Sequence, residues 1–226
     1  MVKRSDARRR PTPRELRRPG LATAAVLVVL FQVFLAAGEP VDTLLARAGS
    51  RTISASDVAL ARALGVLGFA PAASPIERSD VDRYVDALLM LEEAGRIGIE
   101  VEPAAIDAAW VAVGIRAGGE AALERWLRDS AIDRDWARRL VAEDLVKSKF
   151  LDARFAAFVF PDEEAITREL GPGQHDEAAR EQARERLVRQ AASEAQATWL
   201  ADARRRASIR ILLPAGSSVA PPFVLP

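Results

Sequence analysis

The chain has 226 residues, of which 32 are basic, 32 are acidic, one is histidine and none is cysteine. The lack of cysteine excludes a disulfide framework, a thiolate nucleophile and a cysteine-ligated metal. Half of the residues are hydrophobic (50%), so a chain of this length can bury the core of one helical domain.

Charge is distributed unevenly along the chain. Residues 1–20 hold eight basic side chains against two acidic ones, a net charge of +6, so the remainder carries −6, and residues 21–37 have no formal charge. A basic flank before an apolar run is typical of a targeting segment, with the basic flank in the cytoplasm and the later residues exported. We therefore predict a basic cytoplasmic segment at 1–20 and a transmembrane anchor or signal peptide at 21–38.

The sequence leaves both fates of this apolar segment open. Small residues at Ala36 and Gly38 suit signal cleavage before Glu39. A retained helix of seventeen residues would span about 25 Å of a hydrocarbon core that is roughly 30 Å thick. If the segment is an anchor, its membrane-embedded side chains include Leu21, Val26, Leu30 and Phe34.

A small hairpin and a helix are expected next. The apolar run Leu44–Ala48 precedes a turn pair and two β-branched residues within 49–53, a pattern that predicts a strand or hairpin. Ser54, with Asp57 three residues later, predicts a capped helix that ends at Gly68.

Start and stop signals in residues 79–173 predict further helices. They are a helix capped by Ser79 or Asp80 and ending at Gly95, one from Pro103 to about Ile115, a short one before Asp129, one capped by Asp133 and running towards Phe155, and a brief one from Pro161 to Gly171.

The last helix is expected to be the longest. Asp176 can cap it, and residues 177–207 contain no proline or glycine. Alternating apolar residues at Ile209–Leu213 then predict a strand, which we expect to pair with Leu44–Ala48. The fold class is thus mainly α, with a long C-terminal helix and two short edge strands. Residues 214–226, rich in proline, alanine and serine, are predicted to be disordered, although their apolar end would also suit a docking peptide.

This order of elements resembles the N-terminal chaperone domain of SurA-type periplasmic chaperones, a family related to the PpiD and PrsA foldases. The resemblance covers residues 41–213. Its motifs are Leu45–Gly49 with Thr52-Ile53-Ser54 and Asp57, Glu93–Val101 with Ile106–Ala109, Phe158–Ile166, and Ala207–Leu212.

One departure from the family bears on activity. Its enzymatic members carry a parvulin-type prolyl isomerase domain between the short acidic helix and the long C-terminal helix, whereas here only Gly171–His175 lies between them. The resemblance therefore implies a chaperone without the catalytic domain, needing no cofactor or metal. It would hold unfolded secreted or outer-membrane proteins on the periplasmic side of the inner membrane, or in the periplasm after signal cleavage.

The site residues proposed from the sequence are four tryptophans, Trp110, Trp126, Trp136 and Trp199. Tryptophans at helical spacing are most often core residues, but one or two could line a cleft for unfolded clients, because such a cleft must expose apolar surface. The single histidine, His175, has no nucleophile signature around it, so no catalytic residue is predicted. The net charge of −6 after residue 20 disfavours nucleic acid as a partner.

A second hypothesis comes from another functional class. The same fold could be a membrane-anchored assembly or interaction protein that docks one specific envelope partner. The two hypotheses differ in breadth of binding, since a holdase protects many unrelated unfolded proteins and an assembly factor binds one folded partner.

Overall fold

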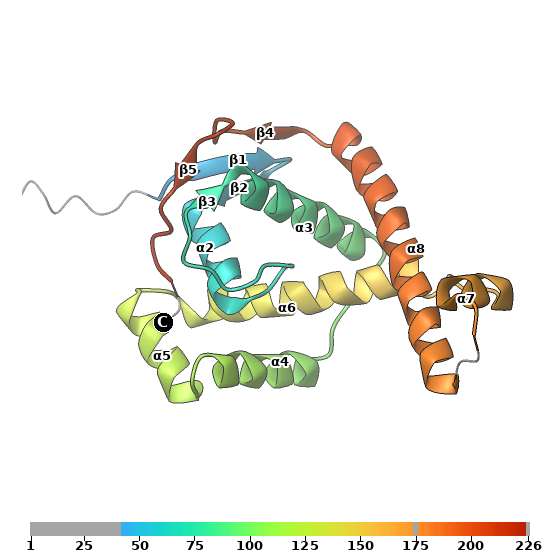
Figure 1. Cartoon of the computed structure of the whole chain (residues 1–226). Helices are drawn as coiled ribbons and strands as arrows, with labels where there is room; N and C mark the ends of the chain where they lie inside the picture. The colour runs from blue at the N-terminus through green and yellow to red at the C-terminus, as the bar shows by residue number, and fades with distance from the viewer. Residues whose placement is uncertain (1–41, 174–175, 225–226) are drawn as a thin grey trace, which may run out of the picture. The chain divides into compact units, whose positions relative to one another are not determined.

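A computed structural model describes residues 42–173 and 176–224 of the chain (Figure 1). The predicted basic segment, the predicted anchor with Leu21, Val26, Leu30 and Phe34, and His175 all lie outside the described residues. Among the helices that the structure describes, none combines the length and apolar character required to cross a bilayer.

The described residues are mainly helical, as predicted. The helices are α2 (Ala55–Leu64), α3 (Arg78–Arg96), α4 (Pro103–Arg116), α5 (Glu120–Asp129), α6 (Arg134–Leu151), the π-helical turn η1 (Asp152–Ala156), α7 (Glu163–Leu170) and α8 (Glu177–Arg206). The strands are β1 (Leu44–Ala48), β2 (Arg51–Ser54), β3 (Ile76–Glu77), β4 (Ile209–Ile211) and β5 (Ser218–Val219).

The predicted pairing between the first and last strands of the domain is confirmed. The sheet has the order β2-β1-β4, and β4 runs antiparallel to β1 with Ala46 opposite Ile211 and Ala48 opposite Ile209. Because α8 leads directly into β4, this pairing fixes the far end of the long helix against the hairpin that begins the domain (Figure 1).

Several caps were predicted correctly. Ser54 and Asp57 form a capping box at α2, in which the Ser54 hydroxyl accepts from the Asp57 amide and the Asp57 carboxylate accepts from the Ser54 amide. Asp133 and Asp176 each accept a backbone N–H at the start of α6 and α8, at 2.7 and 2.8 Å. These bonds satisfy amide groups that a helix start leaves without a partner.

At two of the helix boundaries that differ from the prediction, the contacts explain the difference. Helix α2 ends at Leu64 and not at Gly68, because Gly65 adopts the left-handed conformation (φ +65°) and closes the helix. Helix α3 is capped at Glu77, ahead of Ser79 and Asp80, and the Asp80 carboxylate accepts from the Glu77 amide at 3.0 Å. Asp80 therefore helps to cap α3 from a position inside its first turn.

The predicted disorder of residues 214–226 is wrong for the part that the structure describes. Residues 218–219 form β5, which pairs antiparallel with β3, and Phe223 packs against the main core. Composition indicates disorder here because it does not register tertiary partners, and the segment has partners in β3 and in Trp126. Two short strands were predicted, and the segment adds a second, two-stranded sheet to the fold.

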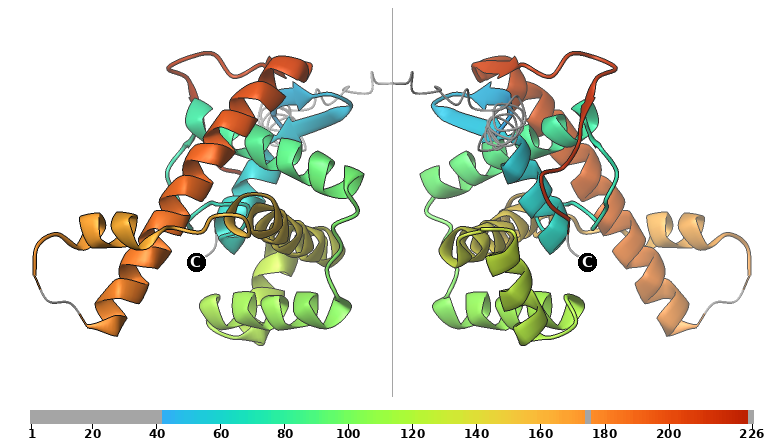
Figure 2. Two further views of the ribbon diagram at one scale, coloured as in Figure 1. Left: turned by 90° about the vertical axis from the view of Figure 1, so that its right-hand side faces the viewer. Right: turned by 90° about the vertical axis from the view of Figure 1, so that its left-hand side faces the viewer.

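The core consists of two clusters within the described residues. The larger is shared by the β2-β1-β4 sheet and the helices α2, α3, α4, α5 and α6, and the smaller joins α3, α6, η1 and α8 around Phe150. We call the elements around the larger cluster the body, and η1, α7 and the N-terminal half of α8 the arm. Helix α7 packs on α8 away from the body, and both views in Figure 2 show this projection.

Candidate functional site

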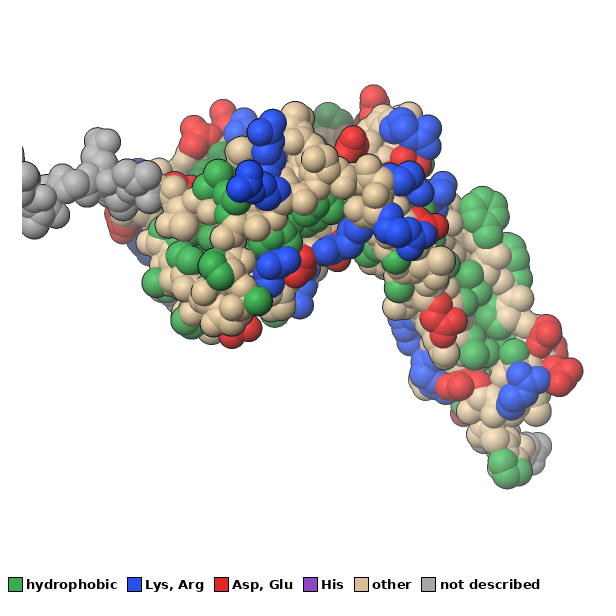
Figure 3. Space-filling view, turned by 90° about the horizontal axis from the view of Figure 1, so that it is seen from above, with side chains coloured by type: hydrophobic (Ala, Val, Ile, Leu, Met, Phe, Trp, Pro, Cys, Tyr) green, Lys and Arg blue, Asp and Glu red, His purple; other side chains and the backbone are tan. Residues whose placement is uncertain are grey.

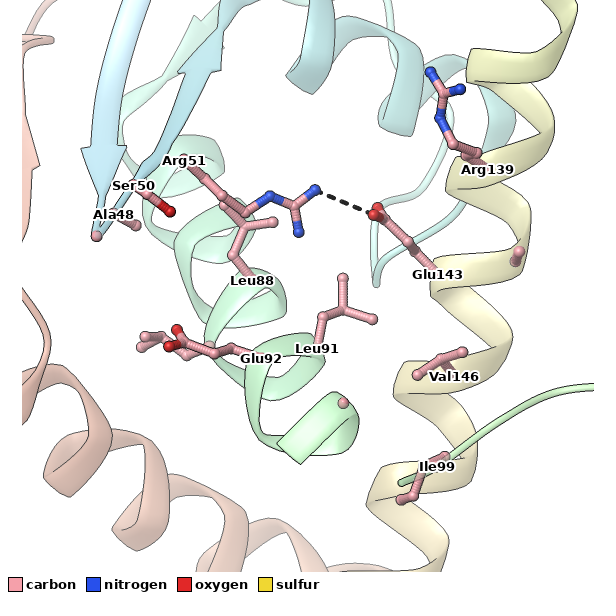
Figure 4. Close-up of a pocket in the computed structure, with 14 residues that line it drawn as sticks. Ala48, Ser50, Arg51, Leu88, Leu91, Glu92, Ile99, Arg139, Glu143 and Val146 are labelled. Carbon is pink, nitrogen blue, oxygen red and sulfur yellow. Dashed lines mark hydrogen bonds and ion pairs between the residues drawn. The ribbon is translucent and has the colours of Figure 1, made fainter. Parts of the chain in front are cut away.

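An open apolar groove lies between α3, α6 and the β1–β2 turn (Figure 4). Its volume is about 560 Å³. The aliphatic side chains that line it come from β1, two helices and the loop after α3. They are Ala48, Leu88, Leu89, Leu91, Ile99, Ala142 and Val146.

Helical periodicity explains why these residues meet. Leu88, Leu91 and Gly95 recur at intervals of three and four along α3, and Ala142 and Val146 are four apart on α6. Residues at these intervals share one helix face. The two faces oppose each other across the groove, and Gly95 adds no side chain to fill it (Figure 4).

Charged side chains gather at the end of the groove next to the hairpin. Arg51 of β2 and Glu143 of α6 form an ion pair at 3.1 Å, with Arg139 close to them on α6 and Glu92 on the opposite wall (Figure 4). These four groups carry two positive and two negative charges. The rim therefore does not select a ligand by the sign of its charge, and the apolar walls provide most of the available binding surface.

The four tryptophans do not converge on this groove. Trp110 and Trp126 are buried in the larger cluster, at 4% and 7% exposure. Trp136 is half-buried at the start of α6 and packs against the same cluster. Both indoles are thus covered in this structure, Trp126 in part by Phe223 of the C-terminal segment, and neither lines the groove.

Trp199 lies at the base of the arm. Its ring contacts those of Phe150 and Phe155, with centroids 5.4 and 6.1 Å away, so three elements meet at one aromatic cluster. The π-helical turn that follows α6 carries Phe155 into this contact. Trp199 is half-buried, and its packing joins α8 to the end of α6.

Two large aromatic side chains are exposed on the arm. Phe158 and Phe160, in the connection between η1 and α7, are 76% and 84% exposed. Figure 3 shows hydrophobic side chains gathered on the arm, with charged residues at its base and towards its tip. Aromatic side chains left in water are candidates for contact with another chain.

The outer face of α4 is also apolar. Trp110 and Val113 on the inner face are buried, whereas Val111 and Ile115 are 60% and 72% exposed. Exposed alanines on the same side complete an aliphatic stripe at intervals of three and four residues: Ala104, Ala108 and Ala112. A helix that is apolar on both faces normally has partners on both.

Buried ionisable groups lie beside the groove and not in it. Burial raises the pKa of Tyr84 well above its usual range, assisted by the negative charge of Asp57. Burial lowers the pKa of Lys147, an effect that nearby Asp144 opposes. Within residues 42–173 and 176–224, no three His, Asp or Glu side chains lie close enough together to hold a metal ion.

The groove and the exposed Phe158 and Phe160 were not predicted as a site. For the arm the sequence does contain a signal, because two phenylalanines flank Val159 directly before Pro161. Large aromatic residues in a loop have few core partners and are therefore candidates for exposure. For the groove no such signal exists, since Leu91 only continues the apolar pattern of the buried residues of α3, Leu88 among them.

No family model matches the chain. A search of curated proteins likewise found no similar sequence. The resemblance to SurA-type chaperones thus remains a prediction from the motifs described above.

Proposed function

We propose that this protein is a non-enzymatic envelope chaperone of the holdase type, which binds extended segments of unfolded secreted or outer-membrane proteins. The observation that carries the proposal is the open groove between α3 and α6, with aliphatic walls and a rim of balanced charge. Such a surface favours apolar side chains of many sequences, which is the requirement for a general client site.

The dimensions of the groove suit this role. A volume of about 560 Å³ lies within the range of pockets that take small ligands, so it can receive a few client side chains at a time. Phe158 and Phe160 offer a second apolar contact on the arm. Because each contact is small and adaptable, we expect dissociation constants on the order of micromolar and rapid release.

The motifs shared with SurA-type chaperones support the same role. In this proposal residues 41–213 are the chaperone unit, the partners are unfolded polypeptides and the inner membrane, and the site is on the periplasmic side. With only residues 171–176 between α7 and α8, the chain would hold clients without prolyl isomerisation and without a cofactor.

The proposal is tested by diluting a denatured outer-membrane-type protein into buffer with and without residues 39–226, and measuring light scattering. Suppressed aggregation at near-stoichiometric ratios, reproduced with an unrelated denatured client, is the expected result. Failure to protect either client, with circular dichroism showing a folded helical sample, would contradict the proposal.

The outer face of α4 favours a second candidate function. Its stripe of alanines with Val111 and Ile115 is flat and aliphatic, a surface that suits a partner helix at close approach. In that case the protein is an assembly factor that docks one envelope partner. Capture of one folded protein, lost on Val111→Glu and accompanied by no protection of unfolded clients, would favour this function over the holdase.

A further inference from the structure

The C-terminal segment lies on the body as an extended peptide. Along residues 219–224 half-buried and exposed side chains alternate: Val219, Pro221 and Phe223 face the body, and Ala220, Pro222 and Val224 face solvent. A period of two is that of extended backbone. Figure 1 shows the segment running from β5 beside β3 towards α5.

One end of the segment is held by strand pairing. Ile76 is opposite Val219 and Glu77 is opposite Ser218 in the two-stranded antiparallel sheet. The body holds this β3 edge firmly, because Ile76 is fully buried and Arg62, at 4% exposure, donates to the Pro75 carbonyl at 3.3 Å. The edge is therefore formed by the body and not by the segment itself.

The other end is held by Trp126. The Phe223 ring meets its indole edge to face, with centroids 6.0 Å apart and planes at 80°. The indole N–H donates to the Val224 carbonyl at 2.8 Å. An aromatic surface that also donates to a backbone carbonyl is the usual way in which proline-containing extended peptides are recognised.

We propose that the β3 edge and Trp126 form a peptide-binding site, and that the chain's own C-terminal segment occupies it as an intramolecular ligand. The site takes extended peptides with an apolar residue at the strand, a proline two residues later and an aromatic residue two further on, as in Val219, Pro221 and Phe223. We call it the tail site.

The packing of the segment distinguishes a displaceable ligand from a permanent part of the core. No side chain from 214 to 224 is fully buried, and residues 214–217, which lead into β5, are all exposed. A short tether gives an effective concentration on the order of millimolar, so the tail stays bound even if its intrinsic affinity is weak. A free peptide then competes only poorly until the tail is weakened.

The identity of the natural ligand rests on the proposed function, in which an unfolded exported chain displaces the tail. The ability of the site to bind an extended peptide does not depend on that function. A synthetic peptide therefore tests the tail site even if the protein protects no client, and failure of the peptide would leave the groove between α3 and α6 untouched.

The test measures fluorescence anisotropy of a labelled peptide with the sequence of residues 217–226, titrated with the full chain. Phe223→Ala weakens the tail and is expected to bind the peptide at least about tenfold more tightly than the wild type, because the competitor has been weakened. Ala220→Ser, on the solvent side of the tail, is the matched control and should behave as the wild type. Adding Trp126→Phe to Phe223→Ala removes the donor and should weaken the peptide about fivefold or more.

A second arm avoids any dependence on the folding of these variants. A specific protease site is inserted between Gly216 and Ser217, in the exposed turn, and the folded chain is then cut. Release of the fragment with the helical signal retained, followed by saturable rebinding, supports the tail site. Equal peptide binding by the wild type and Phe223→Ala, no binding by either, or unfolding after the cut would overturn it.

Discussion

The body and the arm of this protein are stabilised in different ways. The body contains a continuous cluster of fully buried side chains, such as Leu45, Ile53 and Leu60, and its sheet joins the two ends of the domain. In the arm, α7 buries one large side chain completely, Ile166, against α8, while ion pairs of Glu163 with Arg180 and Arg184 lie at the surface.

This difference indicates where the molecule can change shape. Free energy from apolar burial is concentrated in the body, so the walls of the groove between α3 and α6 are held in place. The arm has few buried contacts and exposes Phe158 and Phe160, features of regions that open locally at low free-energy cost. A rigid groove beside an adjustable aromatic arm suits the capture of unfolded chains.

Substitution of Phe150 should have the largest effect, because this side chain joins the two regions. It is fully buried and contacts Phe155 and Trp199. We expect Phe150→Ala to lower the free energy of unfolding by about 3–5 kcal/mol, measured by urea denaturation. Phe158→Ala, at an exposed position, is the control and should change it by less than about 0.5 kcal/mol. Similar losses for both would show that the arm is packed as tightly as the body.

Substitution of Ile166 should loosen the arm alone. Ile166→Ala removes the apolar contact of α7 with α8, a loss of about 2 kcal/mol or more for a fully buried isoleucine. Hydrogen exchange should become faster in residues 163–170 and in the start of α8, with α3 and β1 unchanged. Faster exchange in α3 as well would mean that the arm and body unfold as one unit.

Tyr84 offers a test of rigidity in the body that depends on pH. It is the only tyrosine, and burial raises its pKa in the folded state above the usual value. Above about pH 10 the unfolded chain loses this proton, whereas the folded chain keeps it. The free energy of unfolding is therefore highest below pH 10 and falls as the pH rises further, by up to about 1.4 kcal/mol per pH unit. Tyr84→Phe should remove that part of the slope. Tyrosinate absorbance appearing near pH 10 in the folded protein would contradict the expected protection.

The ion pairs of the arm should have the smallest effect. Glu163 pairs with Arg180 and Arg184, and its side chain is exposed. Glu163→Gln should cost less than about 1 kcal/mol, with the difference from wild type shrinking as salt is raised. Thermal denaturation of both proteins at low and high salt measures this. A larger loss of stability that does not depend on salt would show that these ion pairs contribute substantially to the stability of the arm.

Local signals in the sequence predicted the helices and strands well and the candidate binding surfaces poorly. Caps at Ser54, Asp133 and Asp176 follow from residue types within a few positions of each boundary. Local patterns also indicated the strands β1 and β4, and their pairing was expected because it joins the two ends of the fold. The groove depends on the separation of α3 from α6, a tertiary property that no local pattern contains. The tail shows the same limit, because its order depends on Trp126, which is 97 positions before Phe223 in the chain.

The tryptophan positions illustrate a related physical limit. A large aromatic at helical spacing has the same pattern whether its helix face is covered or open. Trp110 and Trp126 proved to be covered, while the apolar stripe on the outer face of α4 and the two arm phenylalanines proved to be open. Which side of a helix faces solvent is decided by the neighbours that pack on it.

The most direct test of the central claim is the affinity of the groove for an unfolded client. A permanently unfolded, fluorescently labelled outer-membrane-type protein is titrated with residues 39–226 as wild type, Leu91→Glu in the groove, and Ala112→Glu on the outer face of α4 as the matched charge control. Placing a carboxylate on the aliphatic wall should weaken binding by about tenfold or more, with Ala112→Glu within about twofold of the wild type. Equal affinity for Leu91→Glu and the wild type, with both samples folded, would contradict a client site in this groove.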